Sequence, residues 1–281
     1  MSTLQTMPSD SPPPSELRHA ALHWLVECDA VQKAAGVRRL ARDWAAGAVS
    51  LDVDAAVSVA PVSPGHPAKP ELVSPLTVQR RAMNTPEGRA AMIHALVHIE
   101  FNAINLALDA LWRFPNMLRE YYADWLQVAD EEALHFTLLA GHLQTQGFAY
   151  GDFSAHNGLW DMAVRTQHDV LARMALLPRT MEARGLDVTP GTKAKLVQAG
   201  DSAIAPILDI VLRDEIGHVA IGNRWFNYLC AQRGLKPAAT YAALLTEYNA
   251  VLRRGPFNLE ARRAAGFGEE ELADLGMSRA Q

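Results

Sequence analysis

The sequence has few cysteines, no long apolar run and no excess of positive charge, and each lack excludes a class of protein. Cys28 and Cys230 are far apart, so they provide neither a disulfide framework nor a thiolate metal site. No stretch approaches the roughly 18 uninterrupted apolar residues of a membrane span, and the N-terminus lacks the basic start and apolar run of a secretory signal. We therefore expect a cytoplasmic protein without a membrane partner.

The charge balance argues against a nucleic-acid partner. A formal charge of -5 and a pI of about 6.1 give no broad basic field for a phosphate backbone, although a local basic patch would still allow RNA to bind. The 281 residues, 49% of them hydrophobic, are enough for one large domain with a sizeable core and appended segments.

The chain divides into four regions by composition and pattern. Residues 1–14 are rich in Ser and Pro and predict a disordered tail. Residues 15–84 predict N-terminal helices, with Ser15 as the first N-cap, followed by a Pro-rich extended strap. Residues 85–234 carry long helical patterns, and residues 235–281 predict a C-terminal helical extension.

The helical patterns of residues 85–234 are bounded by proline and glycine. They cover residues 85–112, 116–146, 159–184 and 201–233, and the last three end at Gly147, Gly185 and Gly234. Few strand-like alternations occur anywhere. The fold class is therefore all-α, and four long helices predict a four-helix bundle.

Acidic and imidazole side chains interrupt the apolar faces of these helices. Glu100 falls within the apolar face of the first helix. Glu132 and His135 interrupt the second helix, and Glu215 and His218 interrupt the fourth, each pair at i, i+3. This spacing places a carboxylate and an imidazole on one helical face, where both can reach a metal ion.

The spacing along the chain repeats. Glu100 precedes Glu132 by 32 residues, and Glu182 precedes Glu215 by 33, so each half supplies Glu and then Glu-x-x-His. Four buried carboxylates would repel one another and cost several kcal/mol each in desolvation, whereas two divalent cations would offset their charge. Di-iron and di-manganese carboxylate bundles use this ligand set. We therefore predict a dimetal site.

Glu182 fits this pattern least well. Pro178 lies one turn before it and Gly185 three residues after it, so its helix is expected to be kinked and to end close by. A simple hairpin would then place Glu182 and Glu215 at different depths. Residues 186–200 would have to run back along the bundle before the fourth helix begins.

The segments HALVHIEFNAINLALD, DEEALHF, MEARGLDVTPG and DEIGHVAIGNRWF resemble the ferritin-like superfamily. More narrowly, they resemble its bacterial branch labelled as a domain of unknown function, over about residues 61–267. The resemblance implies a ferritin-like bundle with a metal-ligand set comprising Glu100, Glu132, His135, Glu182, Glu215 and His218. That branch is similar to di-iron hydroxylases that modify tRNA bases, which implies oxygen chemistry without naming a substrate.

Other polar residues near the motifs have weaker interpretations. Glu131 and Asp214 precede the two Glu-x-x-His motifs and are candidates to accept the free N–H of a metal-bound histidine, or else are solvent-facing charges. Glu16 and His19 share the motif's spacing but follow a Pro-rich tail, so we expect no metal there. His98 lies two residues from Glu100 and is expected to be a core histidine.

The leading functional hypothesis is an oxidoreductase of the hydroxylase or oxidase type, working as a monomer or dimer. Two iron ions bridged by Glu132 and Glu215 would activate O2 or peroxide for an organic substrate, either a small molecule or a nucleotide-like group. Three alternatives remain open at this point. They are iron oxidation and storage, manganese-dependent peroxide removal on the same ligands, and a structural protein with a vestigial site.

Overall fold

A computed structural model describes residues 15–55, 57, 62–79, 81–250 and 255–277. The predicted tail, residues 1–14, lies outside these ranges. The regular secondary structure of the described residues is helical, with two isolated bridges, Glu16 to Ser50 and Leu72 to Ala155, and no strand. The all-α prediction is confirmed. The elements are α1 (Leu17–Val26), α2 (Ala30–Ala45), α3 (Pro86–Arg113), α4 (Arg119–Thr145), α5 (Gly158–Arg165), α6 (Val170–Leu176), the π-helix η1 (Leu177–Glu182), α7 (Ala183–Gln198), α8 (Ala205–Gln232), α9 (Pro237–Glu247), α10 (Leu259–Ala264) and α11 (Glu269–Met277).

The chain forms two compact units, and the long helices α3 and α4 each contribute to both. Unit 1 comprises residues 1–68 and 104–133, and unit 2 comprises residues 69–103 and 134–281. In unit 1, α1 packs against α2, and the buried Lys33 ammonium donates to the carbonyls of Leu25 (3.1 Å) and Gly65 (2.8 Å) and to Asn105 Oδ1 (2.5 Å). These three bonds attach α1, the start of the Pro-rich strap and α3 to α2.

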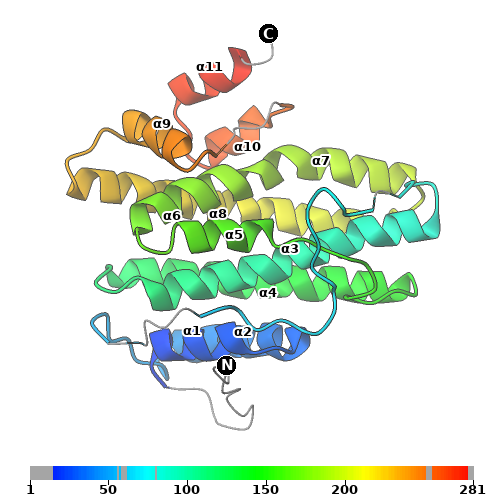
Figure 1. Cartoon of the computed structure of the whole chain (residues 1–281), viewed down its shortest axis with the longest axis horizontal. Helices are drawn as coiled ribbons and strands as arrows, with labels where there is room; N and C mark the ends of the chain where they lie inside the picture. Colours follow the sequence, from blue (N-terminus) through cyan, green and yellow to red (C-terminus); the bar gives the residue numbers. More distant parts are fainter. Residues whose placement is uncertain (1–14, 56, 58–61, 80, 251–254, 278–281) are drawn as a thin grey trace. The chain divides into compact units, whose positions relative to one another are not determined.

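In unit 2, α8 packs against α6, η1 and α7. Figure 1 shows α6, α7 and α8 running alongside one another, with α9 and α10 beside them. Helix α10 contacts both α7 and α8, and α9 contacts α6 and α8. The C-terminal helices are therefore packed onto the run of chain that contains Glu182.

The start of α3 and the ends of α4 and α8 follow local chemistry. Thr85 Oγ1 accepts a hydrogen bond from the Gly88 amide at 3.0 Å and caps α3, and Pro86 occupies the first helical position. Gly147 (φ 83°) and Gly234 (φ 63°) end α4 and α8 in the left-handed region that favours glycine. The first N-cap is Glu16 rather than Ser15, because the Glu16 carboxylate accepts from the His19 amide and ring.

The predicted helix of residues 159–184 is wrong in two respects. A turn at residues 166–169 separates α5 from α6, and the Asp169 side chain caps α6. Gly185 does not end the helix either, since α7 continues through Pro190 to Gln198. Proline lacks the amide that would bond to the carbonyl four residues earlier, and here the Asn258 side chain donates to that carbonyl, on Leu186, at 3.2 Å.

Helix α3 is long and apolar enough to cross a membrane by length and composition alone, with a mean hydropathy of 1.3 over its most apolar window. However, 72% of that window is buried inside the protein. This is the burial expected of a helix in a protein core.

Candidate metal centre

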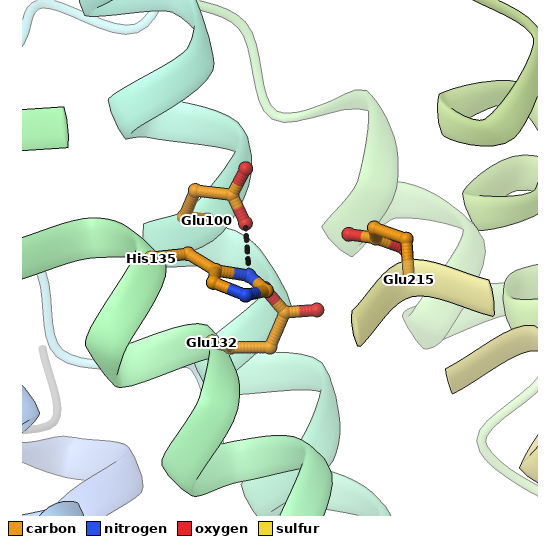
Figure 2. Close-up of side chains that lie close together, drawn as sticks. All are labelled: Glu100, Glu132, His135 and Glu215. Carbon is orange, nitrogen blue, oxygen red and sulfur yellow. Dashed lines mark ion pairs between the residues drawn. The ribbon is translucent and has the colours of Figure 1, made fainter. Parts of the chain in front are cut away.

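Four predicted ligands come together. Glu100, Glu132, His135 and Glu215 each offer one ligand atom, and these four atoms all lie within 4.8 Å of one another. Glu100 comes from α3, Glu132 and His135 come from successive turns of α4, and Glu215 approaches from α8 on the opposite side (Figure 2). All four residues are buried. A buried cluster of three carboxylates and one imidazole could therefore hold a metal ion.

Uninterrupted helical periodicity accounts for this convergence. Buried apolar residues precede and follow each polar residue at helical spacing, such as Val97 and Ile104 around Glu100, and Leu208 and Val219 around Glu215. A polar side chain on the same helical face as these buried residues must also point into the interior. The burial of the apolar neighbours therefore directs Glu100 and Glu215 inward.

His135 is oriented by contacts on both sides of its ring. Its Nδ1 lies 3.5 Å from Glu100 Oε2, and its Nε2 lies 3.1 Å from Asp214 Oδ2. A proton on Nε2 is donated to Asp214, and Nδ1 then presents its lone pair toward the cluster. Metal-bound histidines are commonly held in this way, with the second nitrogen donating to a carboxylate.

Asp214 is suited to accept this hydrogen bond. Burial raises the pKa of Asp214, but hydrogen bonds from Arg213 and His135 lower it more, so that the pKa lies below its ordinary value. The carboxylate thus stays ionised at neutral pH. The other acid considered at this position, Glu131, is half-buried and accepts a hydrogen bond from Gln127 on its own helix at 3.1 Å.

Of the remaining two predicted ligands, His218 lies beside the four. His218 Nδ1 is 3.9 Å from Glu215 Oε2, and the rings of His218 and His135 are 5.9 Å apart between centroids. Glu182 is the last residue of η1, and its Oε2 is shielded from solvent. A Cβ placed on Gly185, three residues later, would lie 4.0 Å from Glu215 Oε2, so the start of α7 runs beside this carboxylate.

The longer helix also reduces the depth mismatch expected for Glu182. Because α7 reaches Gln198 and α8 begins at Ala205, 16 residues separate Glu182 from the end of its helix and 10 separate Glu215 from the start of its own. At 1.5 Å per residue, these distances are about 24 and 15 Å. The two depths are more alike than they would be if the helix of Glu182 ended at Gly185. The prediction that residues 186–200 run back along the bundle is therefore wrong, because residues 186–198 continue onward in the helix that carries Glu182.

The cluster carries more negative charge than its imidazole can offset. Even a protonated His135 would supply one positive charge against three carboxylates, and the adjacent Asp214 is already paired with Arg213 at 2.7 Å. Carboxylate oxygens and imidazole nitrogens are ligands that suit iron, manganese and zinc. The donor set therefore fits a divalent transition metal.

Other motif residues have structural roles. Glu16 and His19 form an exposed ion pair of 2.7 Å that caps α1, and His98 is a core histidine that contacts the Tyr150 hydroxyl (2.9 Å) and the His156 carbonyl (3.1 Å). The prediction from sequence missed the buried Arg179, three residues before Glu182. The one signal in the sequence that could have found it is a charged residue on the apolar side of a proline-containing helix.

The fold and the cluster define an all-helical protein with a buried carboxylate and imidazole site that could hold a metal ion. The chain belongs to the family described as "Protein of unknown function (DUF455)", whose model matches residues 26–273. It is 52% identical over 213 residues to an "Uncharacterized protein" of Haemophilus influenzae (strain ATCC 51907 / DSM 11121 / KW20 / Rd), covering 73% of this chain and 74% of that protein. No solved structure has significant similarity to the chain.

Proposed function

We propose that this protein is a dimetal carboxylate oxidoreductase with a ferritin-like four-helix bundle, in which α3, α4, α8 and the run α6–η1–α7 supply the ligands. The observation that carries the proposal is the convergence of four buried ligand atoms within 4.8 Å. Glu100, Glu132, His135 and Glu215 would hold the first ion, and Glu182 and His218 would help to hold the second. Iron is the first expectation, and manganese suits the same donors.

The charges support two ions rather than one. Four carboxylates from the two Glu and Glu-x-x-His sets carry four negative charges, which two divalent cations offset. A single ion would leave a buried excess of negative charge, which is costly in a low-dielectric interior.

Bound iron would supply the redox chemistry that activates O2 or peroxide toward an organic substrate. The residues of the chain would hold the ions, keep His135 in the tautomer that faces them, and exclude water from the buried side. The substrate class is a small molecule or a nucleotide-like group, and the acting species is a monomer or dimer.

The test is to purify the protein, measure its metal content, load the metal-free form with Fe(II) without oxygen, and mix it with O2 in a stopped-flow instrument. We expect two irons per chain and rapid oxidation with a visible absorption change. A protein that takes up no transition metal, or whose bound iron never oxidises, would refute the proposal. Peroxide removal by the manganese form alone would assign the site to peroxide chemistry instead.

A further inference from the structure

The segment that carries Glu182 is wound as a π-helix, a rare geometry that often occurs at functional sites. Pro178 near its start has no amide to donate, and the Thr180 hydroxyl donates a hydrogen bond to the Ala175 carbonyl at 2.7 Å. Pro178 also packs directly on α8, because a Cβ on Gly222 would lie 2.4 Å from Pro178 Cβ. The backbone path of η1 therefore depends on side-chain contacts as well as on its own backbone hydrogen bonds.

Arg179 is the main such contact. The residue is only 3% exposed, and its guanidinium lies between the rings of Phe226 (5.2 Å), Tyr241 (4.7 Å) and Phe267 (4.9 Å). It donates to Asn223 Oδ1 at 2.5 Å and to the Glu271 carboxylate. A buried positive charge three residues before Glu182 is thus neutralised by a carboxylate from α11.

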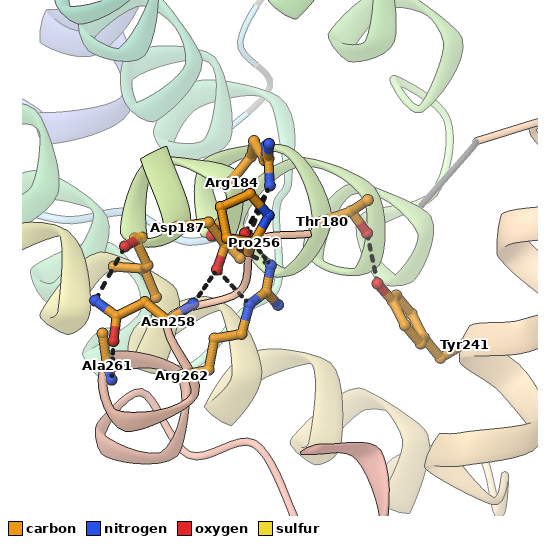
Figure 3. A network of polar contacts seen from close by, with 10 residues as sticks. Thr180, Arg184, Asp187, Tyr241, Pro256, Asn258, Ala261 and Arg262 are labelled. Carbon is orange, nitrogen blue, oxygen red and sulfur yellow. Dashed lines mark hydrogen bonds and ion pairs between the residues drawn. The ribbon is translucent and has the colours of Figure 1, made fainter. Parts of the chain in front are cut away.

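A second attachment follows Glu182 by five residues. The Asp187 carboxylate on α7 accepts two hydrogen bonds from Arg262 on α10, at 2.9 and 2.8 Å, and a third from the Asn258 amide at 3.0 Å. Figure 3 shows this network, with Arg184 reaching the Pro256 carbonyl and Thr180 contacting Tyr241 on either side. Glu182 is therefore bracketed by two buried arginine–carboxylate attachments.

Apart from Asn223 and Phe226 on α8, the side chains that attach this segment lie between residues 241 and 271. We call Tyr241, Asn258, Arg262, Phe267 and Glu271 the C-terminal clamp. Its apolar side joins the same core as α7 and α8, with Leu186, Val219, Ala261, Ala265 and Leu272 buried together. Glu182, meanwhile, is not among the four residues whose ligand atoms already lie within 4.8 Å. Its reach toward the cluster depends on the path of η1.

We propose that Arg179, held by the C-terminal clamp, is a positioning residue for Glu182 and thereby sets the affinity of the second metal position. This proposal rests on the proposed dimetal function. Arg179 is not itself one of the proposed ligands, and we expect the first metal position, formed by Glu100, Glu132, His135 and Glu215, not to depend on it.

The test titrates the metal-free full-length protein with Co(II), whose visible absorption reports its coordination, and fits two affinities. For Arg179→Met we expect the second affinity to fall by at least about tenfold while the first changes by less than about twofold. Glu271→Gln, which keeps the arginine but removes its carboxylate, is expected to lower the second affinity less. Glu182→Gln should lose the second position, and adding Arg179→Met to it should cause no further loss.

The control is Arg263→Met, which breaks the exposed pair of Arg263 and Glu269 (2.6 Å) on the same C-terminal helices and is expected to change neither affinity. Unchanged affinities in Arg179→Met and Glu271→Gln, or an equal loss at both positions, would overturn the positioning role and leave the dimetal function standing. A wild-type protein that takes up no Co(II) would overturn the dimetal function itself.

Discussion

Replacing Glu132 with glutamine should change the stability of the metal-free and metal-loaded protein in opposite directions. The four ligand atoms lie within 4.8 Å of one another, and two ionised carboxylates at that distance repel by about 3.5 kcal/mol at an effective dielectric constant of about 20. Protons bound by the carboxylates relieve part of this repulsion. We therefore expect Glu132→Gln to raise the free energy of unfolding of the metal-free protein by about 1–3 kcal/mol.

The same substitution should remove the stabilisation by metal. A ligand at 100 times its dissociation constant adds about 2.7 kcal/mol to the free energy of unfolding, and a variant that no longer binds it gains nothing. The assay is urea unfolding of the wild type and the variant, each with a chelator and with excess Mn(II). Glu120→Gln, an exposed carboxylate on the same helix, is the matched control and should stay within about 0.5 kcal/mol of the wild type in both conditions.

The reasoning is refuted if Glu132→Gln destabilises the chelator-treated protein by several kcal/mol. That loss would be the signature of a carboxylate that belongs to a satisfied buried ion pair, for which removing one partner costs about 3–5 kcal/mol. A wild type that Mn(II) does not stabilise would contradict the second half of the prediction.

Three further predictions concern single contacts. Asp214→Ala removes the acceptor of the 3.1 Å contact with His135 Nε2, so we expect metal affinity, measured by calorimetric titration, to fall about 10–100-fold. An unchanged affinity would refute the role of Asp214 in orienting His135. Gly222→Ala places a Cβ 2.4 Å from Pro178 and should cost about 1–3 kcal/mol in urea unfolding, whereas Gly217→Ala on the same helix, with nothing within 4 Å, should be neutral or stabilising. Burial lowers the pKa of Lys33 to about 7, so the unfolded chain binds more protons above that pH and the free energy of unfolding should rise from pH 7 to 9, by at most about 1.4 kcal/mol per unit. Lys33→Met should reduce that slope, and an unchanged slope would contradict the assignment.

The sequence predicted best where a helix is long and regular. Glu100, Glu132 and Glu215 lie on helices of 27 or 28 residues, in which one apolar periodicity runs unbroken past the polar residue. Burial of the neighbouring side chains fixes the direction of the polar one, so spacing alone is enough to place it.

The prediction was wrong where distant contacts override a local signal. Gly185 and Pro190 are both typical of a helix end, yet α7 passes through both. The Asn258 side chain donates to the carbonyl that Pro190 leaves without its helical amide, from 68 residues further along the chain. The π-helix could not be predicted from the sequence either. The contact between Arg179 and Glu271 that supports it joins residues 92 positions apart. No periodicity within one helix reports such a contact.

The most direct test is to crystallise the protein purified from cells grown with iron and manganese, and to measure anomalous scattering on both sides of the iron and manganese edges. The account predicts two peaks among Glu100, Glu132, His135, Glu182, Glu215 and His218, with either metal, and none elsewhere at comparable height. A well-ordered cluster with no anomalous peak, its carboxylates bonded to one another through protons or to basic side chains, would contradict it.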